Sequence, residues 1–324
     1  MVTELGPGRE FDLIRRFIEG GVRPGASVRV GPGDDCAVVT GAALAITSDM
    51  SVEDVHFRRS WLEPAEIGYH AAAASLSDLA AVAARPIGIL ASIALGPGDE
   101  DGYGDTVMAG IGAAARDAGV TLLGGDVTRS PGPLVLDVTA VGDAPEPVLR
   151  TGARPGHGVW VTGRLGAAAA AVDAWLAGET PAADARAAFA RPVPRLEEAL
   201  WLRERSVPAA MVDLSDGIAG DAGHIAAANG VRLVIRADAL PVAAAAAGRP
   251  DPVRLAAAGG EDYELCFTSP AGAVETVRDA FVERFGVELT EVGGVEEGTG
   301  AVVVDATGEP LELEAFQHWG RERS

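Results

Sequence analysis

Five short segments of the sequence place aspartate beside glycine, serine or a second aspartate. They are residues 31–35, 47–49, 76–78, 124–126 and 213–217. Glycine lets backbone N–H groups approach an anion closely, and carboxylate and hydroxyl oxygens are the ligands that Mg²⁺ prefers. One such segment by itself is typical of a turn. Five together favour a set of loops that hold divalent cations.

If these predicted loops converge, their carboxylates need cations to stay together. Two carboxylates about 4 Å apart repel each other by about 4 kcal/mol at an effective dielectric constant of about 20. Phosphate groups bound nearby add negative charge, and several Mg²⁺ ions that bridge carboxylate and phosphate oxygens relieve the repulsion. The segments alone therefore predict a magnesium site and do not identify a nucleotide.

Two arginines and one glycine-containing segment are candidates for phosphate binding. Arg129 follows one acidic segment and Arg150 precedes the second half of the chain. Arginine binds phosphate through two parallel hydrogen bonds, although exposed arginines are also common without such a role. Residues 163–166, expected between a strand and a helix, are a weaker candidate.

Residues 259–264, with the sequence GGEDYE, combine two glycines, three acids and an aromatic side chain. One interpretation is a hairpin-like turn. The other is a site in which Glu261 binds a cationic substrate.

The composition excludes several classes of function. The formal charge is −21 and all 26 basic residues are arginine, so neither a G-x-x-x-x-G-K-[ST] phosphate loop nor a Schiff-base lysine is possible. Nucleic acid is a poor partner for so acidic a chain.

Two cysteines, Cys36 and Cys266, argue against a disulfide framework or structural zinc. The N-terminus lacks a signal-peptide core, and charges interrupt the most apolar stretch, which predicts a cytoplasmic protein with no membrane span.

Strands and helices are expected to alternate along the chain, which indicates an α/β or α+β fold. Helices are predicted at residues 11–20, 67–84, 102–119, 165–178, 194–205, 218–230 and 273–286. Strands are predicted within 27–40, 43–57, 86–95, 120–125, 133–143, 159–163, 209–217, 231–237, 263–269 and 300–306. Residues 241–248 are a helix or a surface loop. A segment rich in proline and glycine predicts a boundary between two domains, 1–145 and 146–324.

Eight motifs in order over most of the chain resemble the thiamine-monophosphate kinase family. They are GPGDDCAVV, TSDMSVEDVHF, SLSDLAAVAARP, LLGGDVTRS, LRTGARPG, VTGRLG, DLSDGIAGDAGHI and GGEDYELCFT. The glycine–aspartate pairs are shared with the ATP-binding superfamily that includes aminoimidazole ribonucleotide synthetase and selenophosphate synthetase. The last motif and the spacing from Asp49 to His56 are much more specific to the kinase.

The resemblance implies a phosphotransferase that uses ATP to convert thiamine monophosphate to thiamine diphosphate. It implies a two-domain synthetase-like fold, in which the mixed N-terminal sheet forms a barrel shared in a homodimer and the C-terminal domain is an α/β sandwich. The N-terminal domain would bind ATP and magnesium and mediate dimerisation, and the C-terminal domain would complete the sites for nucleotide and substrate.

The resemblance also assigns site residues, with no single acid or base as catalyst. The positions matching magnesium ligands are Asp35, Thr47, Ser48, Asp49, Asp78, Asp126, Asp213 and Asp216. The positions matching nucleotide contacts are Gly125, Asp126, Arg150 and Ser215. The positions matching substrate contacts are His56, Glu261 and Trp319. Asp54 and His157 depart from the family pattern, and Ser48 replaces the usual threonine.

Other functions use similar residues. A related superfamily enzyme would act on another acceptor, a magnesium phosphohydrolase would use water, and a nucleotide-binding protein would catalyse no turnover. Selenophosphate synthetase is less favoured because Cys36 lies in the GDD loop, directly after residues 31–35, and not in an N-terminal glycine-rich arm. His56 is interpreted as a residue that packs against substrate rather than as a general base.

Overall fold

The structure, a computed structural model, describes residues 26–30, 38–41, 43–99 and 102–313. The predicted helix at 11–20 and two candidate site residues, Asp35 and Trp319, lie outside the described residues. The chain divides into two compact units, residues 1–147 and residues 148–324, within the segment rich in proline and glycine. Each unit is described by itself.

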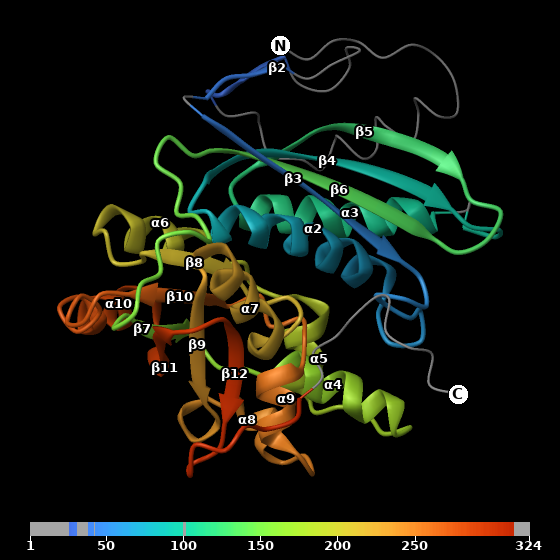
Figure 1. Ribbon diagram of the computed structural model, residues 1–324. Coiled ribbons are helices and arrows are strands. Elements are labelled where there is room, and N and C mark those ends of the chain that lie inside the picture. Colours follow the sequence, from blue (N-terminus) through green and yellow to red (C-terminus); the bar gives the residue numbers. More distant parts are fainter. Residues whose placement is uncertain (1–25, 31–37, 42, 100–101, 314–324) are drawn as a thin grey trace. The chain divides into compact units, whose positions relative to one another are not determined.

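The first unit is a mixed sheet with two helices against one face (Figure 1). Its elements are β1 (Val28–Val30), β2 (Val38–Val39), β3 (Leu44–Val52), α2 (Pro64–Ala81), β4 (Arg85–Leu95), α3 (Tyr103–Asp117), β5 (Thr121–Arg129) and β6 (Val135–Asp143). The strand order is β3-β6-β4-β5, with β4 and β5 parallel and the other pairs antiparallel. This confirms the mixed sheet expected for the N-terminal half.

Helix α2 begins and ends where its sequence dictates. Pro64 stands in the first turn, where its missing N–H costs nothing, and the Glu66 side chain accepts the N–H of Glu63 at 2.9 Å. The helix ends at Ala81, because Ala83 adopts φ +50° and Arg85 precedes a proline in the next strand. More than half of its buried residues are alanine, glycine or serine, and these small side chains allow close approach to the sheet.

Two acidic segments expected as loops lie instead within strands, and a third lies in the helix predicted at residues 67–84. Residues 47–49 pair with β6 along a continuous nine-residue ladder, and residues 76–78 lie inside the eighteen-residue helix α2. Residues 124–126 continue β5, where a Cβ on Gly125 would lie 1.8 Å from the carbonyl oxygen of Ala91. Gly125 therefore permits close strand packing, and the glycine pair does not end the strand.

The second unit contains a six-stranded sheet in the order β12-β9-β11-β7-β10-β8. Its strands are β7 (Gly158–Thr162), β8 (Ala210–Asp213), β9 (Val231–Arg236), β10 (Leu265–Ser269), β11 (Leu289–Glu297) and β12 (Gly300–Val304). Its helices are α4 (Ala167–Leu176), α5 (Ala183–Ala190), α6 (Leu196–Glu204), α7 (Ile218–Asn229), the 3₁₀ turn η1 (Ala237–Ala239), α8 (Ala244–Ala247), α9 (Pro252–Ala258) and α10 (Arg278–Phe285). All strand pairs are antiparallel except β9 with β12.

Helix α7 fixes the part of this unit that carries the acidic segment. It follows β8 after a four-residue turn, and its apolar side chains, including Ile218 and Ile225, pack with Val159 and Val212 of the sheet. It ends as predicted at Asn229, where Gly230 adopts the left-handed conformation.

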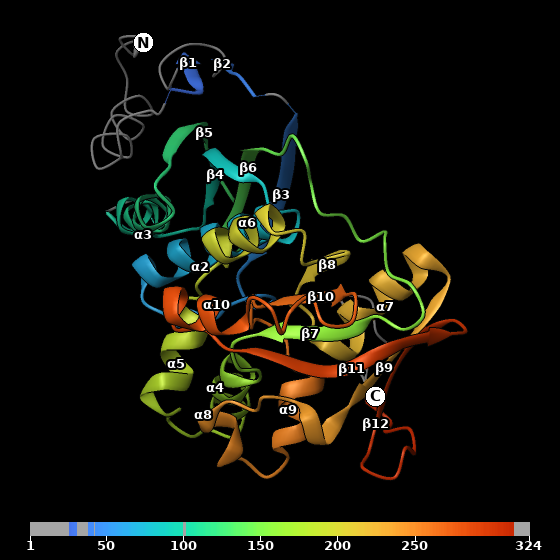
Figure 2. The same ribbon diagram turned by 90° about the vertical axis from the view of Figure 1, so that its left-hand side faces the viewer.

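Figure 2 shows α4, α8 and α9 on one side of the sheet and α10 on the other. No helix among the described residues is both long and apolar enough to cross a membrane.

The contact between α2 and α3 depends on two glycines. A Cβ on Gly110 would lie 1.8 Å from the carbonyl oxygen of Ala65, and one on Gly68 would lie 1.9 Å from that of Val107. Gly112, also on α3, has only the end of the Arg116 side chain nearby, at 3.4 Å. The two helix backbones can approach this closely only because both positions lack side chains.

We expect Gly110→Ala to lower the free energy of unfolding by about 2 kcal/mol or more, because the added methyl group pushes α3 away from α2. Gly112→Ala is the matched control, and it should raise stability by about 0.5–1 kcal/mol through helix propensity alone. Urea denaturation of the two variants measures the difference. Equal stability of the two variants would contradict the packing argument.

Candidate active site

Two acidic residues of the first unit, Asp49 and Asp78, lie together with Thr47 where β3 faces helix α2. Thr47 Oγ1 donates a hydrogen bond to Asp78 Oδ2, and Asp49 hydrogen-bonds with both Ser75 and Asp78. Burial, followed by the charge of Asp78, raises the pKa of Asp49 to about 6. The carboxylates of Asp49 and Asp78 repel each other, and a cation bound between them would relieve that repulsion.

Two other candidates of this unit lie on the opposite face of the sheet, because side chains alternate along a strand. Ser48 Oγ is 2.9 Å from Asp137 Oδ1 and 2.9 Å from Thr139 Oγ1. Asp126 is level with Asp137 across the sheet, since both pair with Ser92 of β4. The structure therefore brings Thr47, Asp49 and Asp78 together on one face and places Ser48 and Asp126 on the other.

His56 lies in a tight turn after β3. Its Nδ1 accepts the N–H of Val52 at 3.0 Å, so the neutral ring carries its proton on Nε2. This bond occupies the lone pair of Nδ1 and agrees with a positioning or binding role rather than general-base catalysis. Asp54 adopts φ +65°, a conformation that aspartate tolerates well, which gives this departure from the family pattern a structural reason.

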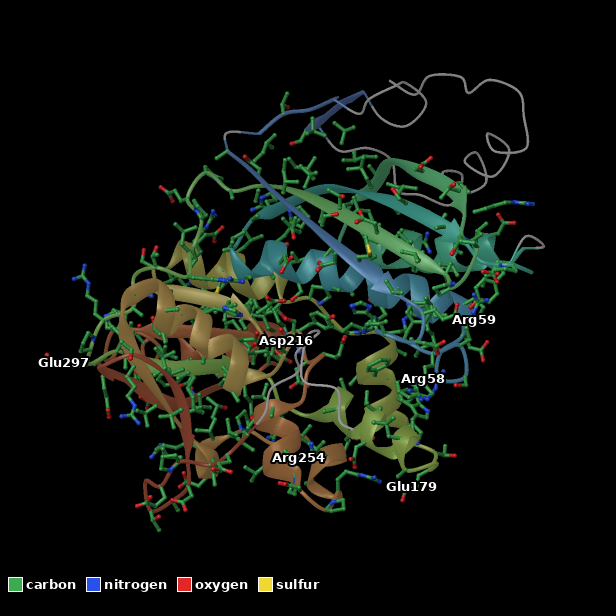
Figure 3. The ribbon with its side chains drawn as sticks, turned by 45° about the vertical axis from the view of Figure 1, so that its right-hand side comes forward. Arg58, Arg59, Glu179, Asp216, Arg254 and Glu297 are labelled. Atoms are coloured by element: carbon green, nitrogen blue, oxygen red, sulfur yellow. The ribbon has the colours of Figure 1, made fainter. Side chains whose placement is uncertain are left out.

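An ion-pair network clamps the turn that carries His56. Arg59 binds Glu53 through two nitrogens, at 2.5 and 2.9 Å, and Asp99 through two, at 2.5 and 3.0 Å. Its guanidinium also stacks 4.5 Å from the ring centre of Tyr103. Hydrogen bonds from Arg59 lower the pKa of Glu53 and of Asp99. Figure 3 labels Arg59, which follows this turn.

In the second unit, the predicted acidic loop is confirmed between β8 and α7. Asp213 is the last residue of the strand, and Asp216, labelled in Figure 3, lies in the turn before the helix. The buried carboxylate of Asp221, in the first turn of α7, accepts the N–H of Asp216 at 3.0 Å and a hydrogen bond from the Ser215 backbone. Burial and then the charge of Asp213 raise the pKa of Asp221 to about 8.

The loop with Glu261 is hydrogen-bonded directly to this acidic loop. The N–H of Glu261 donates to Ser215 O and that of Tyr263 to Leu214 O, both at 2.8 Å. A Cβ on Gly260 would lie 2.5 Å from Ser215 O, so glycine is required for this approach. Glu261 and Tyr263 both have positive φ, +72° and +50°, and the Tyr263 hydroxyl donates to Glu261 Oε2 at 2.9 Å. Such strain in residues other than glycine is typical of functional positions.

The other two acids of GGEDYE are structural. The buried carboxylate of Asp262 accepts the N–H of Gly166 at 2.9 Å and that of Ala167, at the start of α4. Glu264 binds Arg195 at 2.5 and 2.7 Å and accepts the Thr162 hydroxyl at 2.6 Å. Asp262 thus accepts two N–H groups at the start of the helix that follows residues 163–166, and a phosphate contact at those residues stays a prediction.

Arg150 is exposed on a segment that runs beside β8. The carbonyl oxygen of Leu149 accepts the N–H of Met211 at 3.0 Å, two residues before Asp213. A Cβ on Gly152 would lie 2.1 Å from the carbonyl oxygen of Ala209, so this segment approaches the strand closely. The second unit therefore brings Arg150 to the same strand that presents the acidic loop.

The oxygen donors of both units fit Mg²⁺, which prefers one or two carboxylates together with waters and phosphate oxygens. Among the residues that the structure describes, no three His, Cys, Asp or Glu side chains form a group that could hold a metal ion. Asp49 and Asp78, with the Thr47 hydroxyl, are a set of hard oxygens that leaves coordination positions for a phosphate.

Two family descriptions match the chain. Residues 33–144 match "AIR synthase related protein, N-terminal domain", and residues 154–306 match "AIR synthase related protein, C-terminal domain". The thiamine-monophosphate kinase of Salmonella typhimurium is 35% identical over 301 residues, which are 88% of this chain and 89% of that protein. The chain belongs to the thiamine-monophosphate kinase family. This confirms the resemblance drawn from the eight motifs.

Solved structures agree with the two-domain fold of this family. The thiamine-monophosphate kinase of Stenotrophomonas maltophilia is 34% identical, with a TM-score of 0.79 over 93% of this chain and 96% of that chain. AaThiL complexed with AMPPCP and TMP is 29% identical, with a TM-score of 0.75 over 95% of this chain and 96% of that chain.

The structure also identifies residues near the candidates that the sequence did not single out. Ser75 and Asp137 contact Asp49 and Ser48, respectively, and Asn229 binds the segment of Arg150. Asp137 is a carboxylate within an otherwise apolar strand, LVLDVTAVG, and this interruption is the signal that could have identified it. Ser75 and Asn229 resemble ordinary helix residues in the sequence, so only the fold reveals their contacts.

We predict that Asp49→Asn makes the metal-free protein more stable at pH 7 while it lowers turnover by about 100-fold or more. A carboxyl group whose folded pKa is raised destabilises the fold increasingly as pH rises from its unfolded pKa through about 6. Asparagine removes this charge. The exposed Asp126 provides the control Asp126→Asn, which should change stability little. Melting temperatures in EDTA at pH 5 and pH 7 measure the effect, and an equal gain at both values would refute its electrostatic origin.

Proposed function

We propose that this chain transfers the γ-phosphate of ATP to thiamine monophosphate and forms thiamine diphosphate. The membership of its family supports the reaction, because relatives along most of the chain are thiamine-monophosphate kinases. The observation that carries the proposal is the match over 95% of the chain to AaThiL in complex with TMP and AMPPCP, an ATP analogue.

The residues of the first unit supply hard oxygen ligands for the phosphates. Asp49, Asp78 and Thr47 would hold magnesium on one face of the sheet, and Ser48 of β3 and Asp126 of β5 would offer ligands on the opposite face. Magnesium, when bound, would neutralise charge on the phosphate oxygens and hold them in line. Asp35, outside the described residues, matches a further ligand position.

The residues of the second unit have complementary tasks. Asp213 and Asp216 offer further ligands, Ser215 and Arg150 contact the nucleotide, and Glu261 binds the cationic part of the acceptor. The acceptor phosphate is already anionic and nucleophilic, so the residues need to position two anions rather than to remove a proton. The hydrogen bonds between the loops of Ser215 and Glu261 support a common positioning role.

Incubation with ATP, Mg²⁺ and thiamine monophosphate tests the proposal. We expect thiamine diphosphate and ADP in equal amounts, measured by chromatography. ADP with free phosphate alone would instead identify a phosphohydrolase. Absence of any product would favour a nucleotide-binding protein, and either result would overturn the kinase proposal.

We expect Glu261→Ala to raise the KM for thiamine monophosphate about ten-fold or more and to leave the KM for ATP within about two-fold, because a lost charged hydrogen bond is worth about 1.5–3 kcal/mol. The variant Glu261→Gly also removes the carboxylate, but it relieves the backbone strain, since glycine adopts φ +72° easily. Comparison of the two variants therefore separates the effect of the lost charge from the effect of the strain. A rise in the KM for ATP as large as that for thiamine monophosphate would refute the substrate role.

A homodimer is the second part of the proposal. Strand β3 is an edge of the four-stranded sheet within the described residues, and its face opposite α2 exposes Leu44, Ile46 and Met50, with 67% of Ile46 accessible. A long edge strand with exposed apolar side chains is a template for pairing with a second chain.

A cytoplasmic location stays a prediction from the sequence.

We expect Ile46→Asp to convert the dimer to a monomer, because a charge would have to be buried in the apolar contact. Leu176→Asp is the matched control, since Leu176 is similarly exposed, at 63%, on helix α4 of the other unit. Sedimentation velocity at micromolar concentration distinguishes the two states. A dimer that survives Ile46→Asp would place the interface elsewhere.

A further inference from the structure

One side chain, Asn229, binds the backbone that directly follows the Cα atom of the exposed Arg150. Its Nδ2 donates to the carbonyl oxygen of Arg150 at 2.8 Å, and its Oδ1 accepts the N–H groups of Gly152 at 2.7 Å and Ala153 at 3.1 Å. A second Nδ2 hydrogen bond, at 2.7 Å, ends on Ile225 O within its own helix. A primary amide can both donate and accept in this way, and a carboxylate or an aliphatic side chain cannot.

Asn229 is also the last residue of α7, the helix that begins directly after the acidic loop. Asp221 holds that loop at the N-terminal end of α7, through the N–H of Asp216 at 3.0 Å. Asn229 holds the Arg150 segment at the C-terminal end. The helix is packed firmly, with Ile218, Ala222 and Ile225 fully buried. One rigid element thereby fixes both the acidic loop and the backbone from which Arg150 projects.

We propose that Asn229 is a positioning residue for nucleotide binding, acting through Arg150. The inference rests on the proposed function, in which Arg150 binds the phosphates of ATP. Arginine binds phosphate strongly only when its planar fork is correctly aimed, and an anchored backbone reduces the conformational freedom lost on binding. The hydrogen bonds of Asn229 provide this anchor next to the strand that ends at Asp213.

The anchor itself can be tested without any nucleotide. In Asn229→Ala, the amides of Gly152 and Ala153 lose their acceptor and should exchange with deuterium about ten-fold faster or more, while β7 and β10 keep their protection. His224→Ala is the control, because His224 is exposed on the same helix. Unchanged exchange at residues 150–153 would overturn the anchor.

Titration with AMPPCP and Mg²⁺ tests the role in binding. We expect Asn229→Ala to raise the Kd about five- to twenty-fold, and Asn229→Asp, which keeps the acceptor but loses the donor, to raise it at least as much. The KM for thiamine monophosphate should stay within two-fold. Arg150→Ala should also weaken binding, and the double variant should bind no more weakly than Arg150→Ala alone, because both changes remove one interaction.

An additive effect of the two substitutions would overturn the inference, since Asn229 would then act independently of Arg150. Equal losses of affinity for nucleotide and acceptor would also overturn it, by indicating a general loss of structure. These outcomes are distinct from failure of the proposed function, in which the wild-type protein would bind AMPPCP but form no thiamine diphosphate.

Discussion

The mutual repulsion of buried carboxylates is the constraint around which both units are organised. Asp49 lies beside Asp78, and Asp221 lies beside Asp213. Burial, and after it the charge of that neighbour, raises the pKa of Asp49 and of Asp221. Elsewhere the fold balances buried acids with arginine, as in the contact between Arg195 and Glu264. Both units thus place carboxylates close together, an arrangement that a bound cation would stabilise.

Much of the fold was predictable because its hydrophobic periodicity is regular. The predicted helices at α2, α3, α4, α6 and α7 and the strands of both sheets are present. Strand β11 and helices α5 and α9 were not predicted, because β11 is interrupted by glycine and charge and α5 and α9 are short and alanine-rich. The two-domain family fold is confirmed by the comparisons, whereas a barrel shared between subunits stays a proposal.

The candidate site was predictable in its residue types but not in its geometry. Local sequence suggested that glycine beside aspartate marks a loop, yet Gly125 is required by the close approach of β4 and β5. Which face each side chain occupies depends on strand register, which is a property of the folded sheet. For the same reason, the sequence could not reveal that Asp262 and Glu264 support the structure while Glu261, between them and the two glycines, adopts a strained conformation.

Strand β3 also limits how this protein can evolve. Thr47 and Asp49 face helix α2, while Ile46, Ser48 and Met50 face the opposite way, so a single nine-residue segment carries two different surfaces in alternation. Loss or gain of one residue before Thr47 would exchange those surfaces, moving the Asp49 carboxylate to the apolar side and the aliphatic side chains against the helix. A single substitution would then restore neither the face toward α2 nor the opposite face. Sequence drift in this strand must therefore proceed by substitution, and insertions or deletions belong in the turns on either side.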